Sequence, residues 1–180
     1  FGRAGAQWTL ESTIEGNSAE PYFAGDGYLI NGEGFDVSGD GNTLTTGSSQ
    51  GAAPDGGVGY VFTYKRAGGS WINSGETAVP SIARLQFGTR VTLSADASTL
   101  TAVMINVPDI PGNYGRHSLV VFKRDGSGWS QVADLQDSTG YLEFGVSVGM
   151  SRNGRVLAVG SPRSATETSP GTALIYRYRQ

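Results

Sequence analysis

The sequence predicts an all-β protein, and three observations support this fold class. Glycine is frequent, with 28 of 180 residues, and charged residues make up only 16% of the chain, a composition that suits many tight turns. Hydrophobic residues reach 38% and aromatic residues 10%, which is enough for a core and argues against disorder. Short apolar runs alternate with a period of two between turn residues, as half-buried strands do.

Composition also narrows the function classes. The net charge of −3 offers no basic stripe, so we expect no nucleic-acid binding. Without cysteine, neither disulfides nor thiolate metal sites are available. No apolar run approaches the ~20 residues of a membrane span, so we predict none. The sequence begins at Phe1 without methionine or a signal peptide, and we expect a mature, processed or excised piece.

A repeat of about 57 residues runs through the chain. Residues 28–49, 85–106 and 142–162 superpose when they are aligned on a shared serine. The columns that agree are a glycine (Gly32, Gly88, Gly145), the serine (Ser38, Ser94, Ser151) and a leucine (Leu44, Leu100, Leu157). Such internal periodicity is the usual mark of a repeat architecture.

A second signature follows the first in each copy. An aromatic residue precedes a tryptophan by seven positions in Tyr64/Trp71 and Phe122/Trp129, and again in Phe1/Trp8. Basic residues follow these aromatics in "YKR", "FKR" and the C-terminal "YRYR", which predicts a charged stripe on an outer rim. The C-terminal "ALIYRYRQ" matches "YVFTYKR", so the sequence stops just before the point in the repeat at which it starts.

These signatures predict one domain over residues 1–180. Its repeats span roughly 31–84, 87–141 and 144–180, and residues 1–16 supply an outer strand of a further unit. Within a repeat we predict four strands, exemplified by residues 144–150, 156–161, 172–178 and 129–136.

The first two strands of each repeat are joined by a Ser-x-Asp/Asn-Gly turn, in which glycine supplies a positive φ. Ala97 replaces that glycine in the middle copy, and we expect strain there. A repeated unit of four antiparallel strands, whose faces only its neighbours can cover, is typical of β-propeller blades.

The motifs "FG", "SVGMSRNG", "LAVGSP" and "GTALIYRY" resemble the FG-GAP family of propeller repeats, which occurs in integrin-type and many exported proteins. The third copy resembles the family most and the first copy least, because Asn31-Gly32 stands where "FG" is expected. The resemblance implies a β-propeller, an exported, extracellular or lumenal setting, and a calcium site in the first hairpin of a repeat.

Three blades are fewer than the four or more that typically close a propeller ring. Open blades would leave sheet edges and apolar faces exposed, which favours association. We therefore predict that the chain is part of a larger or oligomeric propeller, with a protein partner or further copies of itself.

The best calcium candidates are Asp36, Ser38, Asp40 and Asn42, whose oxygens alternate along the first hairpin. Calcium takes six to eight oxygen ligands, but no acidic residue follows in this hairpin. Ordinary turn chemistry explains the same residues without a metal. We expect no other cofactor.

The chain has only one histidine, His117, and no recognisable setting for a catalytic nucleophile, so we expect no enzymatic activity. The predicted function is a non-catalytic interaction or scaffold module that binds another protein or itself. The alternatives are a carbohydrate-binding, lectin-like propeller and a calcium-dependent adhesion module. Tyr22, Phe23 and Tyr114 are the candidate contacts for a protein or glycan partner. The repeated tryptophans favour packing between blades over stacking on sugars.

Overall fold

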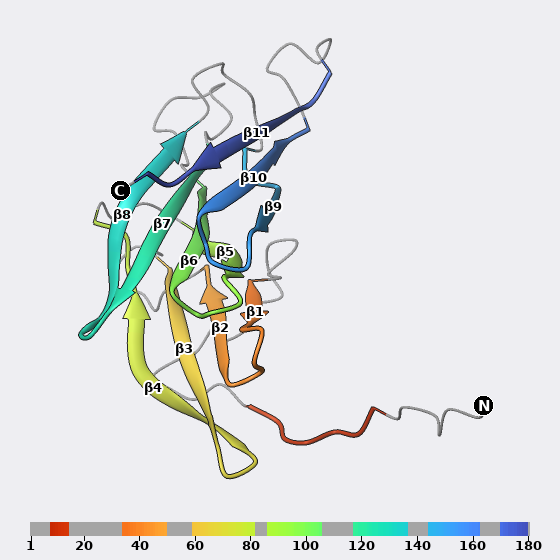
Figure 1. The fold of residues 1–180 in the computed structure, drawn as a ribbon, viewed down its shortest axis with the longest axis vertical. Coiled ribbons are helices and arrows are strands. Elements are labelled where there is room, and N and C mark those ends of the chain that lie inside the picture. Colours follow the sequence, from red (N-terminus) through yellow and green to blue (C-terminus); the bar gives the residue numbers. More distant parts are fainter. Residues whose placement is uncertain are drawn as a thin grey trace, which may run out of the picture.

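The computed structural model describes residues 8–14, 34–49, 59–81, 86–105, 117–136, 144–162 and 170–179. Within these ranges the secondary structure consists of antiparallel strands without a helix, arranged as three sheets in chain order (Figure 1). The first sheet contains β1 (Phe35–Val37), β2 (Thr43–Ser48), β3 (Tyr60–Ala67) and β4 (Ser70–Ala78). The second contains β5 (Phe87–Leu93), β6 (Thr99–Ile105), β7 (His117–Asp125) and β8 (Gly128–Gln136). The third contains β9 (Ser147–Met150), β10 (Val156–Ser161) and β11 (Thr172–Arg177).

Each sheet is a meander in which every strand pairs with the next strand of the chain. This confirms the all-β class and the antiparallel units. The strand predicted over residues 144–150 begins later, at Ser147. Gly145 has a φ of 85° and its amide donates to the carbonyl oxygen of Gly160, so the chain is still turning at that point. The described N-terminal residues 8–14 form no strand.

The hairpin that opens each sheet is stabilised by one serine hydroxyl. Ser94 Oγ accepts a hydrogen bond from the Thr99 amide at 2.9 Å and donates to Asp96 Oδ1 at 2.6 Å. Ser38 and Ser151 make the corresponding contacts in their own hairpins. The expected positive φ occurs in all three copies, at Gly41 (69°), Ala97 (54°) and Gly154 (62°).

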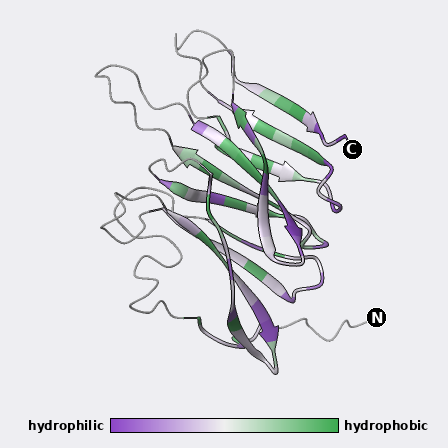
Figure 2. Ribbon diagram, turned by 90° about the vertical axis from the view of Figure 1, so that its left-hand side faces the viewer, coloured by the Kyte–Doolittle hydropathy of each residue, from purple (hydrophilic) through white to green (hydrophobic). Residues whose placement is uncertain are grey.

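The core lies between the sheets and forms two clusters. One cluster joins the first and second sheets, with Val61, Phe87, Leu100 and Phe122 among its buried members. The other joins the second and third sheets, with Val103, Leu119, Phe144 and Val159 among its members. Figure 2 shows the matching pattern, with apolar stretches along the strands and polar residues at many strand ends. Each sheet therefore hides its apolar face against its neighbour.

The first and second sheets approach each other at backbone distance. A Cβ added to Gly47 in β2 would lie 1.9 Å from the carbonyl oxygen of Gly88 in β5. Nearby, Asp36 Oδ2 accepts a hydrogen bond from the Leu93 amide at 2.8 Å, and the Gly39 amide donates to the Ala95 carbonyl oxygen at 2.8 Å. Packing and hydrogen bonds together therefore hold the β1–β2 hairpin of the first sheet against the β5–β6 hairpin of the second.

A helix long and apolar enough to cross a membrane does not occur among the described residues.

Candidate functional site

The junction between the first and second sheets, here called the first junction, is built around Trp129 of β8. Its Nε1 donates a hydrogen bond to Thr63 Oγ1 of β3 at 2.8 Å. The Arg124 guanidinium lies 5.4 Å from the centre of the Trp129 ring and forms an ion pair with Glu76 of β4. A tryptophan from the fourth strand of one sheet therefore reaches the third strand of the sheet before it.

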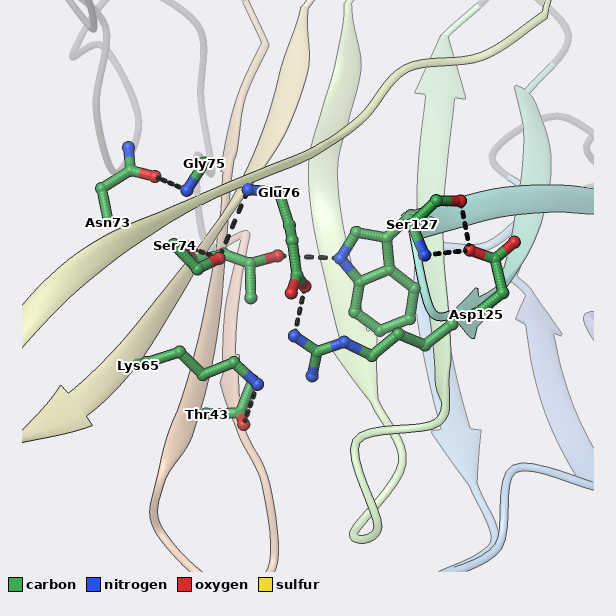
Figure 3. Close-up of polar contacts among 11 residues, drawn as sticks. Thr43, Lys65, Asn73, Ser74, Gly75, Glu76, Asp125 and Ser127 are labelled. Atoms are coloured by element: carbon green, nitrogen blue, oxygen red, sulfur yellow. Dashed lines mark hydrogen bonds and ion pairs between the residues drawn. The ribbon is translucent and has the colours of Figure 1, made fainter.

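Polar side chains of both sheets lie at the first junction, among them Lys65, Glu76 and Asp125 (Figure 3). Lys65 Nζ donates to Thr43 Oγ1 at 3.4 Å, and burial, followed by the nearby Arg124 charge, lowers the pKa of Lys65. In the β7–β8 turn, Asp125 Oδ1 accepts hydrogen bonds from the amide and hydroxyl of Ser127 at 2.8 and 2.6 Å. These hydrogen bonds, with one from Ser130, lower the pKa of Asp125 to about 2. The carboxylate is therefore charged throughout the ordinary pH range.

The strand register relates the first junction to the one between the second and third sheets, here called the second junction. In each sheet the repeated leucine of the second strand pairs with an aromatic residue of the third strand. The pairs are Leu44 with Tyr64, Leu100 with Phe122, and Leu157 with Tyr176. Val121 and Thr63 each precede the paired aromatic residue by one position, so Val121 is the equivalent of Thr63 at the second junction. Tyr178 and Arg124 each follow it by two positions, so Tyr178 is the equivalent of Arg124. The two junctions can therefore be compared position by position.

The second junction contains a hollow of about 190 Å³. It is lined largely by apolar side chains of β7, β8, β10 and β11, among them Val121, Ala133, Leu157 and Tyr176. Ala133 pairs with Val121 and takes the place that Glu76 has at the first junction. No described tryptophan lies in this hollow. The space that Trp129 and Glu76 fill at the first junction is thus unfilled at the second.

A polar groove of about 530 Å³ adjoins this hollow. Its lining combines three basic side chains with one carboxylate, two other polar residues and a tyrosine. These residues are Lys123, Arg124, Arg155, Asp96, Ser98, Asn153 and Tyr178. The groove therefore carries an excess of positive charge at neutral pH.

Lys123 is held in the groove by two contacts of its ammonium group. Its Nζ donates to Thr99 Oγ1 at 2.6 Å and lies 4.9 Å from the centre of the Tyr178 ring. Burial lowers the pKa of Lys123; the Asp96 charge acts against this shift, and the Arg155 charge adds to it. Among the described residues, neither Lys123 nor Arg155 forms an ion pair with a carboxylate, whereas Arg124 pairs with Glu76.

The predicted calcium ligands are only partly brought together. Ser38, Asp40 and Asn42 meet in one turn, where Asp40 Oδ1 accepts hydrogen bonds from Ser38 Oγ at 2.5 Å and from the Asn42 amide at 3.0 Å. Asp36 instead bonds to the Leu93 amide of the second sheet. Within the described ranges, three or more His, Asp or Glu side chains do not gather where they could hold a metal ion. The calcium site stays a prediction.

The remaining predicted contacts, Tyr22, Phe23 and Tyr114, lie outside the described residues. The basic residues that recur after each aromatic, including Lys123 and Arg124, are visible in the sequence, where they predicted a charged rim. Arg155 was missed, because it lies in a different repeat and only the packing of the third sheet on the second brings it beside Lys123. The sequence pattern therefore indicated the basic residues that β7 contributes to the groove, but not Arg155 of the third repeat.

Comparisons with known proteins give few matches. No family model matches the chain, and no curated protein matches it. One solved structure with a similar arrangement of strands is a "putative 6-phosphogluconolactonase" from Bacteroides uniformis ATCC 8492, with 13% identity and a TM-score of 0.48. The alignment covers 79% of this chain and 40% of the neighbour, so the chain spans less than half of that protein.

This comparison corrects one expectation. The neighbour carries the name of an enzyme, which contradicts the predicted non-catalytic interaction or scaffold module, together with its lectin-like and adhesion alternatives. The expectation of no enzymatic activity conflicts with the same name, although a likeness at this distance assigns no activity to the chain. The physical reason for the error is that strand repeats specify architecture, whereas function depends on the side chains of a particular site.

Proposed function

We propose that the three sheets are consecutive blades of a β-propeller of the FG-GAP type, and that the polar groove at the second junction binds a small organic anion. The meander order of each sheet supports the first part. So do the contacts of β5 with β1 on one side and with β9 on the other, which place the first strands of the three sheets next to one another.

The observation that carries the anion proposal is the pair Lys123 and Arg155. Both line the groove, and neither is neutralised by an ion pair within the described residues. The charge of Arg155 disfavours the charged form of Lys123. A bound anion would offset this repulsion and accept charge-assisted hydrogen bonds from both side chains.

The other groove residues favour an anion that also carries hydroxyl groups. The Asp96 carboxylate can accept a hydrogen bond, and Asn153 can donate and accept. The groove volume of about 530 Å³ is in the range of small-molecule sites. A guanidinium such as that of Arg155 matches a carboxylate or phosphate group in a two-pronged geometry. A hydroxylated carboxylate or phosphate ester is therefore the ligand class that fits.

Isothermal titration calorimetry with citrate as the probe tests this proposal. Citrate should bind saturably, and R155Q should weaken the affinity about tenfold, the loss expected for one charge-assisted hydrogen bond. R152Q is the matched control, because Arg152 is exposed on the same hairpin but does not line the groove. It removes the same charge and should leave the affinity nearly unchanged. Absent citrate binding, or equal losses in both variants, would overturn the proposal.

A further inference from the structure

We propose that Lys123 forms a Schiff base with a carbonyl group on the anion that the polar groove binds. The ligand class then narrows to a hydroxylated carboxylate or phosphate ester that also carries an aldehyde or ketone. This inference rests on the proposed function, because the groove must first hold the anion beside the lysine.

The chain has two lysines, Lys65 and Lys123, at equivalent positions of the first and second sheets. Each follows the aromatic residue that pairs with the repeated leucine. Each also donates a hydrogen bond from Nζ to the threonine that begins the second strand of its sheet. These hydrogen bonds measure 3.4 Å from Lys65 to Thr43 and 2.6 Å from Lys123 to Thr99. A comparison of the two surroundings therefore isolates what is particular to Lys123.

The arginine whose charge acts on Lys65 already has a carboxylate partner. Burial, followed by the charge of Arg124, lowers the pKa of Lys65, but Arg124 forms an ion pair with Glu76. Lys65 itself does not line the polar groove. An anion at the first junction would have to displace the Glu76 carboxylate, so Lys65 serves as the unreactive reference.

The arginine whose charge acts on Lys123 has no such partner. Arg155 lines the groove together with Lys123, and among the described residues it forms no ion pair with a carboxylate. Its guanidinium can therefore hold the carboxylate or phosphate of a ligand in a two-pronged geometry. A carbonyl group elsewhere on the same small ligand would then lie beside Lys123, which favours reaction through proximity.

The surroundings of Lys123 also favour the reactive form of a lysine. A lysine attacks a carbonyl as the neutral amine, a form that burial and a neighbouring cation promote. Burial is the largest cause of the lowered pKa of Lys123; the Asp96 charge opposes it, and the Arg155 charge adds to it. Within the part of the chain that the structure describes, Nζ donates one hydrogen bond, to Thr99. Its other hydrogens remain available to a ligand.

The reaction balances without an oxidant or a reductant. After Lys123 gives one proton to water, the neutral Nζ attacks the carbonyl carbon and a carbinolamine forms. The two hydrogens of the neutral amine then leave with the carbonyl oxygen as one molecule of water, and a C=N bond remains. Asp96 lines the groove, and its printed hydrogen bonds all use Oδ1. Its other oxygen can carry the protons of these steps.

Labelling with pyridoxal phosphate tests this inference, because the probe is a hydroxylated phosphate ester with an aldehyde. After reduction with sodium borohydride, peptide mass spectrometry should find the label on Lys123 at least about tenfold faster than on Lys65. Citrate should slow the labelling of Lys123 by competition. R155Q should slow it about tenfold, whereas the exposed control R152Q should leave the rate nearly unchanged.

Lysine-to-arginine variants check the assignment. K123R and K65R both keep the positive charge, and thermal unfolding shows whether both remain folded. K123R should lose most of the incorporated label, whereas K65R should keep it. Equal labelling rates of the two lysines in the wild-type chain would overturn the proposal. So would labelling of Lys123 that neither citrate nor R155Q slows.

Calorimetry with citrate on the wild-type chain distinguishes the two ways to fail. A chain that binds citrate but does not label Lys123 preferentially refutes the Schiff base and keeps the groove as an anion site. A chain that does not bind citrate refutes the anion site and, with it, the inference that rests on it.

Discussion

At the scale of single residues, one serine hydroxyl organises the hairpin that opens each sheet. It accepts the amide hydrogen bond five residues later and donates to the side chain two residues later, in all three copies. The hydrogen bond from Ser38 is also the leading reason that the pKa of Asp40 is lowered. The Ser38 hydroxyl and the Asp40 carboxylate, two of the predicted calcium ligands, therefore stabilise the turn by hydrogen-bonding to each other.

Ala97 is the residue-scale position at which the repeat departs from its best turn chemistry. Its φ of 54° is in the left-handed region, which costs a non-glycine residue about 1–2 kcal/mol. A97G should therefore raise the free energy of unfolding by about 0.5–1 kcal/mol after the extra entropy of glycine is subtracted. Urea denaturation measures this. A95G, in the same turn but without a positive φ, should lower stability, and an A97G variant no more stable than wild type would contradict the account.

At the scale of elements, sheet packing depends on close backbone contact between neighbouring strands. Gly47 in β2 faces the Gly88 carbonyl oxygen of β5 so closely that a methyl group would clash with main-chain atoms. Because backbone cannot move aside as a flexible side chain can, this contact determines how near the first and second sheets lie.

G47A should therefore destabilise the protein by at least about 2 kcal/mol, the cost of overpacking at a rigid site. G149A is the matched control, because Gly149 in β9 has no atom within 4 Å of an added Cβ and no positive φ. It should change stability by less than about 0.5 kcal/mol. Thermal unfolding of both variants measures the difference, and equal effects would show that sheet separation does not depend on Gly47.

The elements also show what sequence patterns can and cannot predict. β10 has its predicted bounds, Val156–Ser161, because apolar alternation and flanking turn residues act locally. β9 is shorter than predicted, since the approach of Gly145 to Gly160 depends on a neighbouring strand. Likewise, the groove depends on Lys123 and Arg155 meeting across two repeats, a contact that no local pattern encodes.

At the scale of the whole molecule, the repeat makes each junction comparable with the others. The first junction holds Trp129, while the equivalent space at the second is a hollow. The all-β class and the antiparallel sheets were predictable, because the same signatures recur at regular spacing. The polar groove was not, because its residues meet at a single junction and the repeat pattern does not specify them.

The central claim is that each sheet packs on the next one in the chain through the hairpin that opens it. The Gly39 amide donates to the Ala95 carbonyl oxygen at 2.8 Å, and a Cβ added to Gly39 would lie against Ala95 Cβ. Because the chain has no cysteine, an introduced cysteine pair reports this contact without interference. G39C/A95C should therefore form a disulfide within one chain under mild oxidation, whereas G39C/R152C, which joins the first sheet to the third, should not. Equal cross-linking in both variants, or none in either, would contradict the account.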